Sequence, residues 1–503
     1  MILERLAKYD GEDKTKNVEK ERRSFQGGSV KITFLINCAV MFLLYSTIGV
    51  KALAQGVSQK NHDFLIQSQS REVIPEKPDK TRDWGIELNS YGLIRSQTRY
   101  FQTSQKPEFQ GELSLYWKKE SLHGWNFDTK GRFSVAEQSI YPQLREAYFR
   151  TEHFAYGRKK LNWFRSINPH PDGVWLPRDL WNKLNIEEEG LVGAFFDRSW
   201  KSWSAKAFVS PFFIPEMSPQ FKLVDSQFVS ENIWFRAPPS ELELSNVPTP
   251  VNYALAETSP VEIALKPGVG FMLAYDRQSW GVRVGAAYKP MNQILLGAPV
   301  SLGLTEEGVN NLNIEVHPRT LYHELGTLEV YFNPSRWQLD WQSTFEHPFR
   351  DDPPEEWLTQ EISPAAIHQA LIRYSWSHRF SQFIHLYYRD GGEAQDRGEF
   401  ASEKSFFEDR FFFSKATSLG FNWLISKGYS SNHQLESKMT YDSDQKGVVF
   451  GFSMFHQLST QWFLRWGGDW IGYLNDDIPD SKQGFIGTYR ANDQFYGGAK
   501  YVF

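Results

Sequence analysis

The chain has 503 residues, a mean hydropathy of −0.50 and a formal net charge of −5 at pH 7. Beyond residue 50 it contains no apolar run approaching the roughly 20 residues that a membrane-spanning helix needs, which excludes a bundle of such helices. Trp, Tyr and Phe nevertheless make up 16% of the sequence. Such an aromatic content is expected of a β-barrel in a membrane, which needs two aromatic girdles and an apolar band facing lipid.

The first 54 residues have the organisation of a secretory signal. A basic region precedes an apolar run from Ile32 to Val50, and the small residues Ala52 and Ala54 follow, as signal peptidase prefers. We therefore expect residues 1–54 to be a signal peptide that is cleaved after Ala54. The apolar run is also long enough to span a bilayer, so an uncleaved inner-membrane anchor is the alternative.

Cys38 is the only cysteine of the chain and lies inside the predicted signal peptide. The mature chain would then contain no cysteine, which suits an oxidising compartment and excludes thiol catalysis and cysteine metal sites. Residues 55–83 are polar and show no apolar period. We expect them to form a flexible periplasmic leader ahead of a barrel that comprises residues 84–503.

From Trp84 onward, segments of about ten residues show alternating polar and apolar side chains, at the length that a tilted membrane strand needs. A helix would scatter these charges around all of its faces, so strands are favoured. The predicted fold is all-β, a single antiparallel transmembrane barrel of about 18 strands, with 16 to about 20 possible. The predicted strands are 85–101, 109–118, 124–135, 143–152, 154–162, 190–198, 203–212, 268–276, 280–289, 323–332, 336–346, 366–378, 382–390, 410–425, 432–442, 446–456, 460–471 and 493–503.

The last predicted strand carries Phe495, Tyr501 and Phe503 on one face and Lys500 on the other. An amphipathic strand that ends on a terminal Phe is typical of bacterial outer-membrane barrels, in which the last strand pairs with the first. We predict that these three aromatic residues close the barrel on its lipid side. A soluble all-β protein is the alternative, but its outward face would be polar.

The connections between the predicted strands alternate in length. Short turns such as 277–279 alternate with long segments such as 163–189 and 290–322, as expected of a barrel with periplasmic turns and outer loops. An extra hairpin could lie within 290–322. The loop 213–267 is rich in proline, carries apolar residues such as Trp234, and is too long for a passive connector. We predict that it folds inward and sets a constriction; a surface lid and a contact with an external partner are the alternatives.

The polar faces of the predicted strands define the lumen. More than half of these charges are expected to pair across neighbouring strands, but the basic surplus predicts a preference for anions. The inward acidic residues are Asp128, Glu146, Glu329, Asp340, Glu346, Glu436 and Asp469. The inward basic residues, which form the predicted anion path, are Lys130, Arg132, Arg150, Arg158, Lys160, Lys206, Arg283, Arg373, Arg389, Lys438, Arg465 and Lys500.

The stretch 143–200 resembles a hairpin of alginate-export-type and related large outer-membrane porins. Its strand Arg-Glu-Ala-Tyr leads into a second strand with a Gly-Arg-x-x-Leu-x-Trp pattern, formed here by Gly157, Arg158, Leu161 and Trp163. This resemblance implies a barrel of about 18 strands that passes anionic or sugar-like solutes.

No catalytic constellation and no metal site stands out in the sequence, so we expect neither an enzyme nor a cofactor. His385 and Ser375 fall on adjacent predicted strands, but chance placement is the favoured explanation. The first hypothesis is a channel, either a porin or an exporter, in the bacterial outer membrane. The alternative is a non-conducting outer-membrane scaffold or anchor for an envelope-spanning or adhesion complex. The expected partners are outer-membrane lipid and lipopolysaccharide, the barrel-assembly machinery and anionic or saccharide solutes; no nucleic acid is expected, and a monomer is favoured.

Overall fold

The structure is a computed structural model. It describes residues 82–502 except 95–108, 120, 122, 135–137, 166–170, 245–246, 305–309, 350–353, 355–356, 398–409, 427–431 and 474–483. The predicted signal peptide, almost all of the predicted leader and Phe503 lie outside the described residues.

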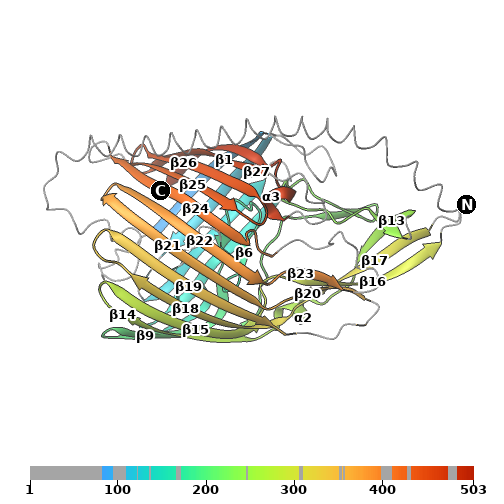
Figure 1. The fold of residues 1–503 in the computed structure, drawn as a ribbon, viewed down its shortest axis with the longest axis horizontal. Helices are drawn as coiled ribbons and strands as arrows, with labels where there is room; N and C mark the ends of the chain where they lie inside the picture. The colour runs from blue at the N-terminus through green and yellow to red at the C-terminus, as the bar shows by residue number, and fades with distance from the viewer. Residues whose placement is uncertain are drawn as a thin grey trace, which may run out of the picture. The chain divides into compact units, whose positions relative to one another are not determined.

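Eighteen antiparallel strands pair into one continuous sheet that closes on itself (Figure 1). The first strand pairs with the last, from Gly85 opposite Val502 to Ile94 opposite Asp493. The predicted all-β barrel of 18 strands is therefore confirmed, and each predicted strand overlaps an observed one. The barrel strands are β1 (Arg82–Ile94), β2 (Phe109–Lys119), β3 (Gly124–Ser134), β4 (Ser139–Arg150), β5 (Phe154–Lys159), β8 (Leu191–Trp200), β9 (Trp203–Phe212), β14 (Gly268–Asp276), β15 (Trp280–Pro290), β18 (Tyr322–Phe332), β19 (Trp337–Pro348), β21 (Ala365–Ser377), β22 (Phe380–Gly391), β24 (Lys415–Ser426), β25 (Asn432–Asp442), β26 (Gly447–Gln457), β27 (Trp462–Tyr473) and β28 (Asp493–Val502).

Alternation along the strands separates an apolar exterior from a polar interior. In β14, Phe271 is 58% exposed whereas its neighbour Met272 is 2% exposed and faces inward. Phe495 on the closing strand is also exposed, and the Tyr501 ring packs at a tilt against Trp462 of β27 with ring centroids 4.9 Å apart. Exposed apolar side chains are favourable in lipid and unfavourable in water. This outer surface is therefore that of a membrane-spanning barrel.

The two ends of the barrel differ in their connections. At the end called here the turn end, hairpins close through short turns such as 201–202, 277–279 and 378–379. At the opposite end, the loop end, long segments connect the strands, including 160–190 and 213–267. This alternation is the one expected from the sequence, and it places the turn end in the periplasm by the general rule for bacterial barrels.

Segments from four connections at the loop end assemble into a separate sheet, which Figure 1 shows beyond the ends of the barrel strands. In spatial order this loop-end sheet consists of β12 (Glu241–Leu244), β13 (Val247–Leu255), β17 (Asn310–Arg319), β16 (Leu295–Leu304), β20 (Trp357–Ile362) and β23 (Ala394–Arg397). Its core contains Val251, Leu312 and Ile314, all 2% exposed or less. The hairpin that the sequence left open within 290–322 is therefore present, as β16 and β17.

The loop 213–267, which the sequence predicts to fold inward, contributes to this sheet. It supplies β12 and β13 to the loop-end sheet, together with the small hairpin of β10 (Lys222–Val224) and β11 (Gln227–Val229) and the helix α2 (Pro260–Ala264). Phe228, Leu242, Val251 and Tyr253 of the loop pack in the core of that sheet, whereas Ile233 and Trp234 pack in the core inside the barrel. Among the described residues, neither α2 nor α3 (Phe485–Thr488) has the length and apolarity to cross a membrane.

Candidate functional site in the barrel lumen

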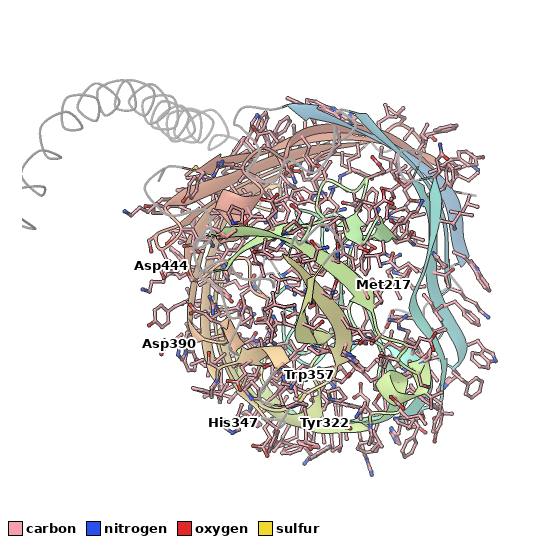
Figure 2. The ribbon with its side chains drawn as sticks, turned by 90° about the vertical axis from the view of Figure 1, so that its right-hand side faces the viewer. Met217, Tyr322, His347, Trp357, Asp390 and Asp444 are labelled. Atoms are coloured by element: carbon pink, nitrogen blue, oxygen red, sulfur yellow. The ribbon has the colours of Figure 1, made fainter. Side chains whose placement is uncertain are left out.

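A different connection occupies the lumen: residues 160–190, between β5 and β8, named here the lumenal segment. Viewed from the loop end, the barrel strands form a ring around further chain segments (Figure 2). The lumenal segment contains the short strands β6 (Arg178–Asp179) and β7 (Glu187–Glu188), which pair with each other. Its side chains reach strands on opposite sides of the barrel, as the following contacts show.

Gly157 explains why the chain leaves the wall early. β5 has only 6 residues, and Gly157 within it has φ +127°, a backbone conformation that glycine alone adopts readily. A Cβ atom there would lie 2.2 Å from the carbonyl oxygen of Ala147 on β4. Two residues later the strand ends, and the Arg158 guanidinium donates to the carbonyl oxygen of Gly190 at 3.0 Å, which holds the two ends of the lumenal segment together.

The first part of the lumenal segment follows the inner wall towards β19. Trp163 is 3% exposed and packs on Phe208 of β9, and its carbonyl oxygen accepts a hydrogen bond from Arg283 of β15 at 3.2 Å. The backbone N–H of Arg165 donates to Glu329 of β18 at 3.1 Å. The Gly-Arg-x-x-Leu-x-Trp pattern therefore marks the place where the chain turns from the wall into the lumen.

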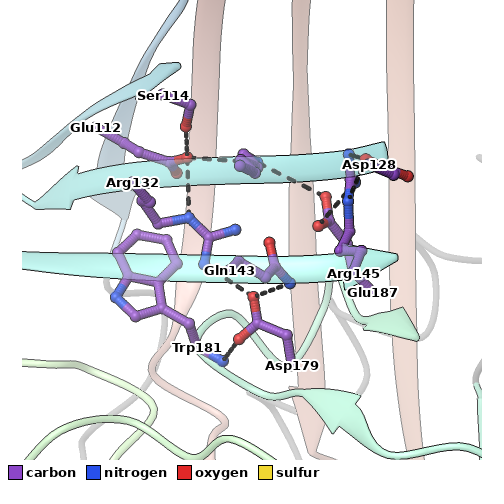
Figure 3. Close-up of polar contacts among 10 residues, drawn as sticks. Glu112, Ser114, Asp128, Arg132, Gln143, Arg145, Asp179, Trp181 and Glu187 are labelled. Atoms are coloured by element: carbon purple, nitrogen blue, oxygen red, sulfur yellow. Dashed lines mark hydrogen bonds and ion pairs between the residues drawn. The ribbon is translucent and has the colours of Figure 1, made fainter. Parts of the chain in front are cut away.

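The last part of the lumenal segment is held against the opposite wall, formed by β2, β3 and β4 (Figure 3). Arg132 donates to Glu112 and to Asp179, both at 3.0 Å, and its guanidinium lies 4.5 Å from the centre of the Trp181 ring. Gln143 donates a second hydrogen bond to Asp179 at 3.0 Å. All these groups are buried, so removal of Arg132 would leave Asp179 without its guanidinium partner and Glu112 with Lys130 alone, at high cost.

A second set of ion pairs continues along the same wall. Glu187 accepts from Arg145 of β4 at 3.2 Å and lies 3.6 Å from the ammonium group of Lys130 on β3. Burial raises the pKa of Glu187, but the positive charges of Lys130, Arg145 and Arg132 outweigh that effect and hold the pKa at about 2. Glu187 is therefore ionised at neutral pH and attracts the lumenal segment to this wall.

The middle of the lumenal segment is tied to the connections at the loop end. Arg178 donates to both carboxylate oxygens of Glu216, at 2.9 and 3.2 Å, and to the carbonyl oxygen of Arg410 at 3.1 Å. Trp175 donates to Thr327 of β18 at 2.9 Å. Bidentate arginine–carboxylate pairs are among the stronger polar contacts because both bonds are charge-assisted. The segment is consequently fixed at its middle as well as at its ends.

Aromatic residues from three loop-end connections cover the lumenal segment. Lys183 donates to the hydroxyl of Tyr489, which in turn donates to the carbonyl oxygen of Trp234 at 3.0 Å. The rings of Phe412 and Phe485 stack at 4.3 Å. Residues 234, 412, 485 and 489 are named here the aromatic cover. Trp234 belongs to the loop 213–267, so that loop takes part in covering the lumenal segment.

Several residues of the predicted anion path face the interior in ion pairs. Lys130, Arg132 and Arg158 are buried, and each pairs with a carboxylate of the lumenal segment. Arg283 lies 3.3 Å from Asp276, Arg389 lies 4.0 Å from Glu393, and Lys206 lies 3.9 Å from Asp197. The sequence predicted that more than half of these charges would pair, and the structure shows that part of the pairing is with the lumenal segment instead of within the wall.

The remaining predicted residues lie elsewhere on the inner wall, except Lys160, which begins the lumenal segment. Arg373 donates to Gln338 on the neighbouring strand at 3.1 Å, and the Arg465 guanidinium lies 5.3 Å from the Tyr496 ring. Arg150 ends β4, whereas Lys500 stands opposite Phe463 of β27. The backbone N–H of Lys160 donates to the Glu146 carboxylate. Lys438 stands opposite Gly451 of β26.

Acidic residues of the lumenal segment change the interior charge balance. Residues 161–190 add five carboxylates, Asp172, Asp179, Glu187, Glu188 and Glu189, and three basic residues, Arg165, Arg178 and Lys183. These groups, together with Glu112, Asp197 and Asp276, which also pair in the interior, reduce the basic surplus that the predicted strand residues suggest. The run Glu187-Glu188-Glu189 before β8 was the sequence signal that this segment lies inside the barrel. Three consecutive carboxylates can pair with the basic residues that line the preceding strands.

Glu188 differs from its neighbours. Burial, together with the negative charge of Asp172, raises its pKa to about 7. Its protonation therefore changes within the physiological pH range, whereas Glu187 beside it stays ionised.

The Ser375 and His385 pair considered from the sequence is not formed, because Ser375 stands opposite Ser381 and His385 stands opposite Leu371.

No protein-family model matches the chain. No curated protein matches it either. Among solved structures, the chain is similar to OmpT, an outer membrane protein of Vibrio cholerae, with 8% identity and a TM-score of 0.37 over 84% of this chain and 96% of that chain. It is similar to Pseudomonas aeruginosa OccK5 (OpdH), with 8% identity and a TM-score of 0.40 over 84% and 98%. A third similar structure is Acinetobacter baumannii OccAB4, with 10% identity and a TM-score of 0.39 over 84% and 99%. By its own closed strand pairing and apolar exterior, the chain is an integral outer-membrane β-barrel.

Proposed function

We propose that the protein is a narrow outer-membrane channel whose conductance is limited by the lumenal segment. The observation that carries this proposal is the reach of that segment, which bonds to Glu329 on one wall and to Arg132 on the other. An 18-stranded barrel encloses more space than its own side chains fill. A segment fixed across this space narrows the water-filled path without needing to close it.

The channel is expected to prefer small anionic or sugar-like solutes. The basic residues of the inner wall support the anion preference, because a narrow charged passage with low-dielectric walls concentrates ions of opposite sign. The resemblance of residues 143–200 to alginate-export-type porins supports the sugar-like solutes. In a salt gradient across a planar bilayer, the reversal potential should have the sign of a modest anion preference, and cation selectivity would overturn this part of the proposal.

The decisive experiment compares single-channel conductance with and without the middle of the lumenal segment. Residues 171–186 are replaced by a Gly-Ser linker, which removes the contacts of Arg178, Asp179 and Lys183. Conductance should rise several-fold, because removal of these residues widens the water-filled path through the barrel. The control replaces residues 296–318 of the loop-end sheet, which lie outside the barrel wall, and should leave conductance near the wild-type value. Absence of current from both the wild type and the 171–186 variant would refute the channel.

A non-conducting scaffold is the second candidate function. The aromatic cover and the loop-end sheet favour it, because they build a solid surface above the lumen at the loop end. The same measurements separate the two candidates. A silent wild type with a conducting 171–186 variant would indicate a scaffold whose lumen is filled by the segment, whereas a conducting wild type indicates the channel.

A further inference from the structure

Four neighbouring hairpins share one feature at the turn end. Their turns carry Lys201, Arg277, Arg336 and Arg379, and all four side chains are exposed. The hairpins are adjacent around the barrel, because β9 pairs with β14, β15 with β18, and β19 with β21. The four cations therefore stand side by side along one part of the rim, named here the basic arc.

Each cation of the basic arc follows or precedes an outward aromatic residue. Trp200 and Trp203 flank Lys201, Trp337 follows Arg336, and Trp376 lies three positions before Arg379; all four tryptophans are between 42% and 47% exposed. Outward tryptophans at a strand end mark the depth of the lipid headgroups. The adjoining cations consequently lie at or just beyond the headgroups of the leaflet that faces the turns.

The aromatic rings beneath the basic arc are in contact with one another. Trp203 lies 4.9 Å from Tyr275, and Tyr275 lies 5.4 Å from Trp280. Arg277 is positioned over this group, since its Nε donates to the Tyr275 hydroxyl at 2.6 Å. The surface is thus a fixed arrangement of rings and guanidinium groups.

The carboxylates of the same hairpins point the other way. Asp197, Asp276 and Asp340 lie near the turn end, but they pair in the interior with Lys206, Arg283 and Arg165 respectively. Among the ion pairs of the described residues, none includes a cation of the basic arc. Elsewhere on the described rim, the turn at 151–153 carries Glu152 and residues 458–461 carry no charge, whereas Lys118 and Lys119 precede the turn between β2 and β3.

We infer that the basic arc binds the phosphate headgroups of anionic phospholipids in the leaflet that faces the turns. Lysine and arginine near a membrane surface attract anionic lipids, and each contributes roughly a fivefold enrichment. Arginine also matches phosphate with two parallel hydrogen bonds. Zwitterionic lipids offer the same phosphate but no net charge, so they should compete poorly at this place.

The test uses the full barrel reconstituted in phosphatidylcholine vesicles. Brominated phosphatidylglycerol or brominated phosphatidylcholine is added, and quenching of tryptophan fluorescence reports which lipid lies next to the tryptophans. The wild type should be quenched more strongly by brominated phosphatidylglycerol, by a factor of several. The triple variant K201Q/R336Q/R379Q should lose most of this preference, whereas the matched variant K222Q/K266Q/K446Q, which removes three lysines at the loop end, should keep it.

Two outcomes would overturn the inference. One is equal quenching by the two lipids in the wild type, or an equal loss of preference in both triple variants. The other is removal of the preference by inorganic phosphate at matched ionic strength, which would indicate a site for free anions in place of lipid. If the triple variant does not fold, the single variant R336Q serves instead and should lower the preference in part.

Discussion

Gly157 is the residue at which the wall and the lumen of this barrel separate. Its positive φ and its close approach to Ala147 belong to a position that only glycine fills without strain. The next residue, Arg158, then fixes the far end of the lumenal segment through Gly190. Two adjacent residues therefore determine where β5 ends and where the segment that narrows the lumen begins.

Substitution Gly157→Ala should destabilise the folded barrel, because the added Cβ would meet the Ala147 carbonyl oxygen at 2.2 Å in a backbone conformation unfavourable to alanine. The expected loss is about 1–3 kcal/mol or more, measured by urea unfolding in phospholipid vesicles. Gly326→Ala on β18 is the matched control, since a Cβ there meets nothing within 4 Å. Equal stability of the two variants would show that the position of Gly157 is not strained.

Arg132 is the second residue whose role is open to direct measurement. Arg132→Gln leaves Glu112 and Asp179 buried without their shared cation, and the expected loss of stability is about 3–5 kcal/mol. Adding Asp179→Asn to this variant should cost less than it does in the wild type, because the unpaired carboxylate is then removed. A double-mutant cycle by urea unfolding measures this coupling, and an additive result would show that the Arg132–Asp179 contact contributes no stability of its own.

At the scale of elements, the strands were predictable and the role of the loops was not. A barrel strand is recognised from side-chain alternation within about ten residues, so all 18 strands could be found locally. The contacts of the lumenal segment are long-range, with Lys183 and Tyr489 separated by 306 positions. Neither Val174 nor Trp181 belongs to a periodic pattern, although both are buried. Length and proline content therefore predicted an inward fold for the loop 213–267. The features that mark the lumenal segment in the sequence are Gly157 and the three consecutive glutamates.

The lumenal segment should make the channel sensitive to pH near neutrality. Glu188 has a pKa of about 7, so raising the pH from 6 to about 8 adds one negative charge to the lumen. Anion preference should fall over this range, as measured by the reversal potential in a salt gradient, and E188Q should reduce the change. The same shift affects stability: this group favours the folded state below pH 4.5, and its contribution is lost as the pH rises towards about 7. A pH response of unchanged size in E188Q would show that Glu188 is not the titrating group.

At the scale of the whole molecule, the barrel and the loop-end sheet have separate cores. Leu312 and Ile314 pack with the sheet, whereas Phe208 and Met272 pack in the lumen. The sheet depends on the barrel for the placement of its strands, but no barrel strand pairs with it. The barrel is consequently expected to survive loss of the sheet.

Replacement of residues 296–318 by a short linker tests this independence. It removes β16 and most of β17, but β15 and β18 keep their pairing, so the barrel should unfold at nearly the wild-type urea concentration. Residues 251–255 lose their partner strand and should become sensitive to added protease. Loss of barrel stability would instead show that the two cores fold as one unit.

The pairing of β13 with β17 has a consequence for the order of folding. These two strands are parallel, and β14 and β15 lie between them in the chain. β17 can reach β13 only after that intervening hairpin has crossed the bilayer and delivered the following residues to the same side. Because closing such long chain loops is slow, the sheet should form late, after membrane insertion, and its appearance would time the last step in the maturation of this barrel.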